Sequence, residues 1–396
     1  YIGIKDGKID FVKKSYTGTE DVIKVEGVIL PAGIDMHVHF RDPGMTEKED
    51  FHSGSVSAAC GGITTVMEMP NTSPPTNTRS RLEDKIKIGE RKSVIDFGLY
   101  GLLSDEIGEM AELIDFFKVY MAPSTDAQAL KGEELERLLN RAHSQGVSVA
   151  FHPEDQSFFN EPGSDLKSYN ESRPLKSELK AIETLKSLPC KDKYVCHLTS
   201  KDSLGKVKEY GYVSEVTPHH LFLSDEAFLG QFGKVNPPLR DDSKRFPLWK
   251  AFERGQIDIV ASDHAPHLER EKEDDFQDAP AGLPGVETIY PLLLNSVSRG
   301  KISMSTVVGS IALNPARILG LKKGKIEEGY SADLIVIDFR ETEPIKAEKL
   351  HYKCGWTPYE DFQGIFPRKV ISDGKIIVDD KEFVGEKGDG EYIGKK

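Results

Sequence analysis

The chain is poor in cysteine and has no long apolar run. Its 396 residues contain four cysteines, at positions 60, 190, 196 and 354, and none of them forms a CxxC pair. Isolated cysteines in a long chain without an export signal are more often reduced core residues than disulfide partners. No apolar stretch approaches the roughly 18 residues that cross a bilayer, and the first residues lack the charged, apolar and small segments of a signal peptide. We therefore expect a soluble cytoplasmic protein with no membrane partner.

The chain also lacks an excess of basic residues. It has 52 Lys and Arg against 65 Asp and Glu, which gives a net charge of −13. Nucleic acid requires a basic face for its phosphates, so we expect no nucleic-acid partner. A small anionic substrate is still compatible with this charge, because one arginine in a pocket outweighs distant charges that are screened over roughly 10 Å. The content of 38% hydrophobic and 30% charged residues allows a full core and argues against disorder.

Both ends of the chain read as short strands separated by turns. The pair Asp6-Gly7 is typical of a hairpin turn. Two strand-rich ends that flank one different middle predict a small β-sandwich domain assembled from residues 1–30 and 319–396. The expected strands lie at 2–9, 22–25, 324–326, 332–337 and 370–378.

The middle of the chain, residues 31–318, alternates short apolar runs with amphipathic stretches such as 133–139 and 179–185. About eight strands alternating with helices is what a parallel (β/α)₈ barrel requires. The predicted fold class is therefore α/β, a TIM barrel with a small β-sandwich built from both termini. The apolar runs are 33–36, 64–69, 95–100, 116–120, 147–151, 194–197, 212–216 and 257–261.

Catalytic groups in such a barrel lie at the C-terminal ends of the strands, and the first run leads into His37-Val38-His39. Positions i and i+2 of a strand face the same side, so both imidazoles can point to one metal ion. A His-x-His pair on its own is at least as often a structural or surface pair. The pair therefore needs support from the ends of other strands.

A second group is Lys118, which interrupts an apolar run between Phe117 and Val119. A charged lysine without a partner is costly inside an apolar strand. In one interpretation the side chain lies near the strand end and reaches water. In the other, a neutral lysine amine takes up CO₂ as a carbamate, which is an anionic bridge between two cations.

Three further candidates end other runs. His152 ends the fifth run, His197 ends the sixth, and Asp263 follows the eighth. Either histidine alone also reads as a satisfied core residue, and Asp263 as the N-cap of a helix. An aspartate at this place can also bind a metal ion and relay protons.

Together these groups fall at the ends of strands one, four, five, six and eight, which independent structural coincidences explain poorly. The ligand set is nitrogen and oxygen, without cysteine. Two zinc ions fit it best, although manganese, cobalt or iron are compatible, because ligand type alone discriminates weakly. His219 and His220 follow the seventh run. We expect them to pack or hydrogen-bond rather than to line the site.

Four sequence blocks resemble the dihydroorotase family of the amidohydrolase superfamily. They span about residues 30 to 315, and jointly they are highly specific. The longer barrel with a carbamate candidate at Lys118 is similar to the type I branch of that family. The blocks are DMHVHFRDPG at 35–44, GGITTV at 61–66 with MPNT at 69–72, SDHAPH at 262–267 and GLPGVET at 282–288.

The resemblance implies a zinc-dependent cyclic amidohydrolase. Its reaction would be the reversible cyclisation of N-carbamoyl-L-aspartate to L-dihydroorotate in de novo pyrimidine (UMP) biosynthesis. The partner implied is a small-molecule substrate, with a homo-oligomer and association with other pyrimidine-pathway enzymes left open. The resemblance implies that His37, His39 and Asp263 bind one zinc ion, and that His152 and His197 bind the second. Lys118 would carry a CO₂-derived carbamate that bridges the two ions. Asp263 would also carry the proton in catalysis.

The same resemblance implies that Arg41, Asn71 and His267 bind the substrate. Dihydroorotate carries a carboxylate on its ring, and a guanidinium fork matches that group in a bidentate way. Rings without this carboxylate, the substrates of dihydropyrimidinases and hydantoinases, need no such arginine. The alternative for Arg41 is a salt bridge to Asp42 or Glu47.

The segment 121–128 follows the fourth run and allows two interpretations. In the family a loop here can close over the substrate, and Ser124 or Thr125 could hydrogen-bond it. The alternative is an ordinary strand-to-helix loop in which Asp126 caps the next helix.

Two other functions compete with the favoured one. The first is an allantoinase or another cyclic-ureide hydrolase of the hydantoinase kind, which would use the same metal centre. The second is a metal-free homologue with a structural or partner-binding role. Retention of all the candidate ligands argues against the second.

Overall fold

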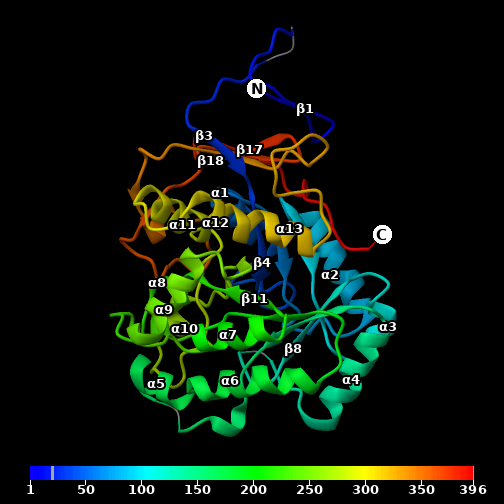
Figure 1. Cartoon of the computed structure of the whole chain (residues 1–396), viewed down its shortest axis with the longest axis vertical. Helices are drawn as coiled ribbons and strands as arrows, with labels where there is room; N and C mark the ends of the chain where they lie inside the picture. The colour runs from blue at the N-terminus through cyan, green and yellow to red at the C-terminus, as the bar shows by residue number, and fades with distance from the viewer. Residues whose placement is uncertain (19–21, 126, 162, 396) are drawn as a thin grey trace.

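The computed structural model describes residues 1–18, 22–125, 127–161 and 163–395, and its centre is a barrel of parallel strands (Figure 1). The barrel strands are β4 (Gly33–Val38), β5 (Ile63–Glu68), β6 (Asp96–Leu99), β7 (Gly101–Leu102), β8 (Phe116–Tyr120), β9 (Ser148–His152), β10 (Lys193–Val195), β11 (Val213–Val216) and β12 (Ile259–Val260). Strands β4 to β6 pair in one sheet and β7 to β12 in a second, and only Tyr100 separates β6 from β7. The barrel closes where the His39 N–H donates to the His264 carbonyl at 2.8 Å.

The strand residues explain why this barrel is a packed core. All side chains of β4, β5, β8 and β9 are buried. Strands that are covered on both faces read as continuous apolar runs rather than as an alternation, which is how they stand in the sequence. All eight predicted runs became barrel strands, with ends that shift by at most a few residues.

Helices connect the strands and cover the barrel. In α4 the buried residues Leu135, Leu138, Leu139 and Ala142 follow the i, i+3, i+4, i+7 spacing of one helix face. The two predicted amphipathic stretches lie in α4 and at α6. The helices are α1 (Phe51–Cys60), α2 (Arg79–Lys92), α3 (Ile107–Met110), α4 (Gly132–Ser144), α5 (Leu166–Ser172), α6 (Leu175–Thr184), α7 (Lys201–Glu209), α8 (Pro218–Phe222), α9 (Asp242–Glu253), α10 (Glu269–Lys272), α11 (Ile289–Ser298), α12 (Met304–Val308) and α13 (Asn314–Ile318).

Strands from both ends of the chain form a second layer above the barrel (Figure 1). They are β1 (Ile2–Lys5), β2 (Lys8–Val12), β3 (Val28–Pro31), β13 (Leu334–Ile337), β14 (Glu343–Pro344), β15 (Gln363–Gly364), β16 (Lys369–Ser372), β17 (Lys375–Asp379) and β18 (Glu382–Phe383). The order β18-β17-β16-β13-β3 places an N-terminal strand at the edge of a C-terminal sheet, in antiparallel pairing with β13.

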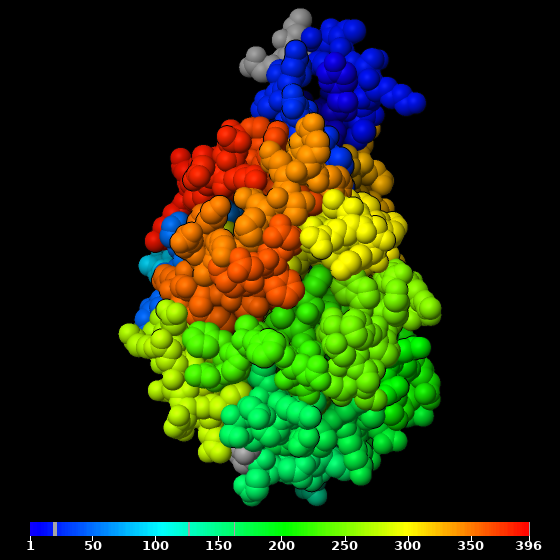
Figure 2. All heavy atoms as spheres, turned by 90° about the vertical axis from the view of Figure 1, so that its left-hand side faces the viewer, coloured from blue at the N-terminus to red at the C-terminus, as the bar shows by residue number. Residues whose placement is uncertain are grey.

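The hairpin β1–β2 packs against this five-stranded sheet. Its Ile9 lies in one apolar cluster with Ala332 and Leu334. Asp6 and Gly7 turn the hairpin at φ of 50° and 76°, as the Asp-Gly signal predicts. Figure 2 shows the C-terminal residues, orange to red, between this blue hairpin and the green part of the barrel. The predicted β-sandwich from both termini is confirmed, while its division from the barrel at residues 30 and 318 stays a prediction.

Two of the predicted terminal strands are wrong. Residues 22–25 and 324–326 form no strand. Val22 and Ile23 are exposed, and β-branched residues make a strand only where a neighbouring strand accepts their hydrogen bonds. Gly324 has a φ of 77°, which belongs to a turn.

The expectations drawn from cysteine and from hydropathy can also be compared with the structure. All four cysteines are free, and Cys60, Cys196 and Cys354 are buried, as expected for reduced core residues. Within the part of the chain that the structure describes, no helix combines the length and the apolarity needed to span a membrane.

Candidate active site

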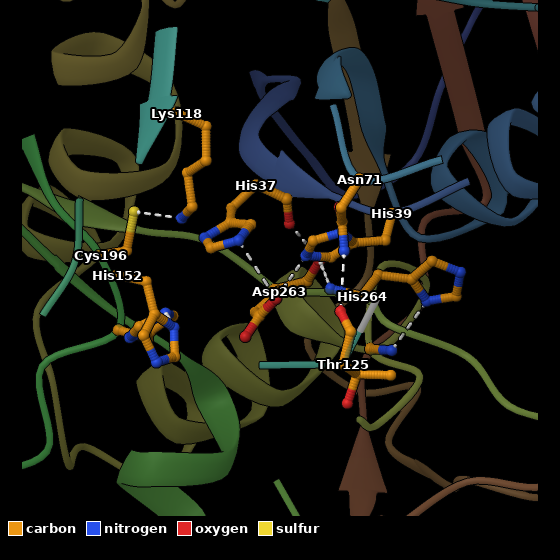
Figure 3. Close-up of polar contacts among 12 residues, drawn as sticks. His37, His39, Asn71, Lys118, Thr125, His152, Cys196, Asp263 and His264 are labelled. Atoms are coloured by element: carbon orange, nitrogen blue, oxygen red, sulfur yellow. Dashed lines mark hydrogen bonds and ion pairs between the residues drawn. The ribbon is translucent and has the colours of Figure 1, made fainter. Parts of the chain in front are cut away.

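The six side chains predicted to bind metal come together in one cavity at the strand ends of the barrel (Figure 3). All six are buried, although they come from distant parts of the chain. Arg41 and Asn71 line the same cavity. Its lining residues are His37, His39, Arg41, Asn71, Lys118, Tyr120, Ser124, Thr125, His152, His197, Val235, Asn236, Asp263, Ala265, Ala281 and Gly282.

His37, His39 and Asp263 form the tightest part of the cluster. The Nε2 atoms of His37 and His39 lie 3.2 and 3.1 Å from the same oxygen, Oδ1 of Asp263. Both rings therefore face one point from the end of β4, as the i, i+2 spacing predicts. One donor atom from each of the three residues lies within 4.8 Å of the other two.

Neighbouring residues determine which ring nitrogen of each histidine carries the hydrogen. The Asn71 Nδ2 group donates to the Thr125 carbonyl at 3.3 Å, so its Oδ1 faces His39 and accepts from His39 Nδ1 at 2.7 Å. His37 Nδ1 likewise lies 3.0 Å from a Glu215 carboxylate oxygen and donates to it. These bonds leave the Nε2 atom of each ring for another ligand.

Burial and charge act on these groups in opposite directions. Burial lowers the pKa of His39 to about 3. Burial also disfavours the charged form of His37, but the carboxylates of Asp263 and Glu215 outweigh it and raise the His37 pKa to about 10. Burial alone would raise the pKa of Asp263, yet His37 and His39 hold it well below the usual range. Asp263 is therefore a buried carboxylate.

This arrangement fits a divalent cation. A neutral His39 with hydrogen on Nδ1 presents the lone pair of Nε2 to the Asp263 carboxylate at 3.1 Å. Two electron-rich atoms at this distance repel each other unless a cation contacts both. Nitrogen and oxygen donors at one point are the ligands that zinc accepts.

His152 and His197 converge in the same way. His152 Nε2 donates to Glu154 at 2.7 Å, which leaves the lone pair of Nδ1 directed at His197 Nε2, 3.0 Å away. Two nitrogen ligands at tetrahedral angles on one zinc ion lie about 3.3 Å apart. Arg173 holds Glu154 in place, with a contact of 3.1 Å from its Nε. The prediction that these two histidines meet is confirmed, and their ligand role stays a prediction.

Lys118 is completely buried in β8, so the interpretation that it reaches water is wrong. Its Nζ donates to the Cys196 thiol at 3.0 Å. Within the described residues, no carboxylate lies within 4 Å of this amine to compensate a positive charge. A lysine in such surroundings is suited to carry a group that changes its charge.

The backbone bends unusually at the same place. Arg41, His197 and Asp263 have φ values of 62°, 37° and 47°. This region is unfavourable for residues other than glycine, and such strain gathers at functional sites. The next helix after Asp263 begins only at Glu269, so the interpretation of Asp263 as a helix N-cap is wrong.

Arg41 is buried in the cavity wall and is held from behind by the SDHAPH segment. Its Nε donates to the Pro266 carbonyl at 3.2 Å, and its Nη2 lies 3.2 Å from His267 Nε2. Lys48 Nζ lies 3.3 Å from the other ring nitrogen of His267. His267 therefore contacts Arg41 but is not among the described residues that line the cavity, and a direct bond from His267 to substrate stays a prediction.

The segment after β8 contributes two lining residues. Ser124 and Thr125 both border the cavity, and the Thr125 hydroxyl donates to the Ala281 carbonyl at 2.9 Å. A hydrogen bond from either residue to a substrate stays a prediction. Asp126, the alternative helix cap, lies outside the described residues, and α4 begins at Gly132 with Lys131 at its N-cap.

Sequence reasoning missed several groups that orient the predicted ligands. Glu215 accepts from His37 Nδ1, from the His197 backbone N–H at 2.7 Å and from the Tyr194 hydroxyl. It interrupts an apolar strand in the way Lys118 does, and the same signal could have found it. Cys196, the partner of Lys118, has no such signal because cysteine is ordinary in a core.

Both histidines after β11 are buried, and their rings pack against each other with centroids 4.4 Å apart, which fits the expected packing or hydrogen-bonding role. His220 Nε2–H donates to the Pro237 carbonyl at 3.1 Å, and its Nδ1 accepts from the Thr217 hydroxyl at 2.8 Å. The hydrogen-bonding role of His220 is confirmed. His219 is buried, and its Nε2 has no hydrogen-bond partner within the described residues.

Comparison with known proteins identifies relatives along nearly the whole chain. Residues 28–377 match the amidohydrolase family. A dihydroorotase of Methanosarcina mazei is 38% identical, over 98% of this chain and 93% of that protein. A dihydroorotase of Thermoplasma acidophilum is 39% identical, over 97% of this chain and 92% of that protein.

Solved structures show the same fold. The L-hydantoinase (dihydropyrimidinase) from Arthrobacter aurescens superimposes with a TM-score of 0.92 and 28% identity, over 99% of this chain and 95% of that one. A dihydropyrimidinase from Brevibacillus agri superimposes with a TM-score of 0.88 and 26% identity, over 98% and 93%. The barrel predicted from the alternating apolar runs and the family predicted from the sequence blocks are both confirmed.

Proposed function

The chain belongs to the amidohydrolase family, and on that premise we propose that it catalyses the dihydroorotase reaction, the reversible interconversion of N-carbamoyl-L-aspartate and L-dihydroorotate. Relatives named dihydroorotase match it over nearly its whole length at 38–39% identity. The reaction is a step of de novo pyrimidine biosynthesis, which uses small soluble metabolites. We therefore assign the enzyme to the cytoplasm. Homo-oligomerisation and association with other enzymes of the pathway stay predictions.

The observation that carries the choice of substrate is Arg41. Its guanidinium lines the same cavity as Asp263 and Asn71 and is buried. Dihydroorotate differs from uncharged cyclic ureides in its ring carboxylate, and arginine binds a carboxylate through two parallel hydrogen bonds. Inside a buried cavity such a pair is stronger than at a surface. Arg41 and Asn71 would therefore hold the carboxylate while the ring amide lies at Asp263.

We assign the metal ligands to the two converging groups of side chains. His37, His39 and Asp263 would hold one ion, and His152 and His197 the second. Zinc suits these donors, and other divalent ions stay compatible. When bound, the two ions would lower the pKa of water and polarise the ring carbonyl.

Lys118 would carry a carbamate between the two metal positions. Its amine is buried among the ligand histidines and has no carboxylate partner in the described structure. Bond formation between Nζ and CO₂ would release the amine proton to solvent and leave a carbamate anion with two oxygens. The cluster then has the negative charge that two divalent ions require.

The residues of the chain account for the proton transfer. Hydrolysis breaks the ring C–N bond after water adds to the carbonyl carbon. Asp263 accepts a proton from that water and delivers it to the departing nitrogen. Its low pKa makes it a carboxylate at neutral pH and ready for the first of these transfers. In the reverse direction the same carboxylate takes the proton from the carbamoyl nitrogen.

A second candidate function is supported by the solved structures. The neighbours from Arthrobacter and Brevibacillus are a hydantoinase and a dihydropyrimidinase. The same metal cluster would serve those reactions, so only the part of the cavity around Arg41 distinguishes them. A metal-free structural role disagrees with the complete set of converging ligands.

Substrate turnover tests the proposal. The purified chain, supplied with zinc and bicarbonate, is assayed with dihydroorotate, dihydrouracil, hydantoin and allantoin. We expect kcat/KM for dihydroorotate to exceed the others by about 10²-fold or more, which corresponds to about 3 kcal/mol from the ring carboxylate. Turnover of an uncharged ring at an equal or higher kcat/KM would establish the second candidate instead.

A further inference from the structure

A second group of metal-binding side chains lies in a separate cavity, where the C-terminal part of the chain crosses the barrel. Cys60 ends α1, Glu287 precedes α11, and His351 belongs to the segment between β14 and β15. One donor atom from each lies within 4.8 Å of the other two. The cavity measures about 390 Å³ and shares no described lining residue with the catalytic one. We propose that Cys60 and His351, supported by Glu287, bind one zinc ion that fastens the C-terminal segment to the barrel.

The backbone is built so that Glu287 approaches the end of α1. A Cβ atom at position 61 would lie 2.5 Å from the Glu287 carbonyl oxygen and 2.7 Å from its Cα. Only glycine permits this approach. Gly61 therefore lets Glu287 lie beside Cys60, the residue that precedes Gly61 in the chain. Glu287 of the GLPGVET block therefore belongs to this second cluster, whereas Gly282 of the same block lines the catalytic cavity.

Glu287 determines the orientation of the His351 ring. Its Oε1 accepts from His351 Nδ1 at 2.8 Å, and its Oε2 accepts from the His351 backbone N–H at 2.8 Å. His351 Nδ1 therefore carries a hydrogen, and Nε2 is the ring atom that faces Cys60. A carboxylate that orients a histidine in this way is the usual support of a histidine that binds zinc.

The distance between the two donor atoms fits one zinc ion. His351 Nε2 lies 3.7 Å from Cys60 Sγ. Zinc binds sulfur at 2.3 Å and nitrogen at 2.0–2.1 Å, so two such ligands at a tetrahedral angle lie about 3.6 Å apart. The mixture of sulfur, nitrogen and carboxylate favours zinc over calcium or magnesium.

The charge of the cluster also favours a cation. Burial and then the carboxylates of Glu287 and Glu382 raise the pKa of the Cys60 thiol. Glu382, in β18, borders the same cavity and could complete the coordination. Lys346, Lys349 and Lys381 border the cavity too, and Lys346 and Lys381 are paired with carboxylates. A divalent ion at Cys60 would compensate the carboxylates beside the thiol and replace the thiol proton, which leaves to solvent.

Metal binding to Cys60 can be measured without the catalytic reaction. The protein is stripped with a chelator and reloaded with cobalt, whose charge-transfer absorption reports a thiolate ligand. The variants are Cys60→Ser and His351→Gln. The matched control is Cys354→Ser, because Cys354 is buried in the same C-terminal region and its thiol donates to the Trp356 carbonyl at 3.7 Å, away from the Cys60 cluster. Bound metal per chain is measured by elemental analysis after excess metal is removed.

We expect Cys60→Ser and His351→Gln each to bind one metal ion fewer per chain and to lose the thiolate absorption. The control should match the wild type in both readouts. Equal metal content in all four proteins would overturn the proposal, as would an absorption band that disappears with Cys196→Ser but survives Cys60→Ser. His351 is partly exposed, so His351→Gln keeps the test valid if Cys60→Ser fails to fold. The result is independent of which ring the catalytic cavity opens.

Discussion

The barrel mouth and strands β16 and β17 of the terminal sheet place charged side chains differently. In the terminal sheet, Lys375 and Lys369 turn outward from β17 and β16 and pair with aspartates at the surface. At the barrel mouth, Lys118, His37 and Asp263 are buried together. Burial of ionisable groups costs free energy, so their concentration at one place indicates a chemical role rather than a contribution to stability.

The two regions also differ in where the backbone is strained. In the terminal sheet, left-handed conformations occur at Asp6-Gly7 and Asp373-Gly374, where a hairpin turn needs them. At the barrel mouth they occur at Arg41, which begins the turn closed by the Met45 N–H donating to the Arg41 carbonyl, and at Asp263, where no hairpin turn follows. In the terminal sheet these conformations allow regular strand pairing. At the barrel mouth the backbone strain directs side chains toward one point.

Replacing Lys118 should give the largest effect on the catalytic side of this comparison. We expect Lys118→Ala to lower kcat by about 10³-fold, which is about 4 kcal/mol, because the bridging anion between the metals is lost. Short carboxylic acids such as acetate should restore part of the rate by occupying the vacated position. The measurement is dihydroorotate turnover with and without added acid. Rates close to the wild type without any acid would rule out the bridging role.

Removal of the Arg41 guanidinium should have the next largest effect. Arg41→Met is expected to raise KM for dihydroorotate by about 10- to 100-fold, since a charge-assisted pair contributes about 1.5–3 kcal/mol. The slow turnover of dihydrouracil, which has no ring carboxylate, should change by less than about 3-fold. If both substrates lose activity equally, Arg41 supports the site as a whole and does not read the carboxylate.

Replacing Glu215 tests whether the residues that orient the predicted metal ligands contribute to metal binding. We expect Glu215→Gln to weaken metal binding by about 10- to 100-fold, because it loosens the orientation of His37. Activity should then need a higher free metal concentration and should disappear at lower chelator concentrations. The control is Asp379→Asn, which removes a surface carboxylate paired with Lys369 in the terminal sheet. Identical chelator titrations for Glu215→Gln and the wild type would contradict this role.

The smallest effect is expected in the terminal sheet. Gly374 has a φ of 79°, and a Cβ there would lie 2.9 Å from Ile4 Cγ2. Gly374→Ala should lower the free energy of unfolding by about 1–2 kcal/mol, seen as a lower urea midpoint, while kcat/KM stays unchanged. Gly205→Ala in α7 is the control, because its Cβ meets open space in a helix and should not destabilise. A loss of activity in Gly374→Ala would mean that the two regions are coupled.

Much of the barrel was predictable because its signals are local. Each strand lies on a mostly apolar run, such as Phe116–Tyr120 with its one lysine, and α4 repeats its apolar residues with a helical period. The strands at 22–25 and 324–326 were wrong, because composition indicates extended residues but not whether a partner strand lies beside them. Pairing of β3 with β13 joins residues about 300 positions apart, which a local pattern cannot specify.

The candidate site was predictable in its ligands and not in its supports. His37, His39 and Asp263 stand in recognisable blocks at strand ends, where side chains of a parallel barrel converge. Glu215, Glu154 and Cys196 stand in no such block, and their roles depend on distances to residues far away in the chain.

The order of residues alone determined the fold class, the family and the set of donor atoms, because periodicity and short blocks are properties of neighbouring residues. Only the tertiary structure decided which ring nitrogens of His37 and His39 donate a hydrogen bond and that Lys118 is buried. It also decided that Cys60 lies beside His351. Those outcomes follow from closure of the barrel and from the path of the C-terminal segment, both of which bring distant residues within bonding distance.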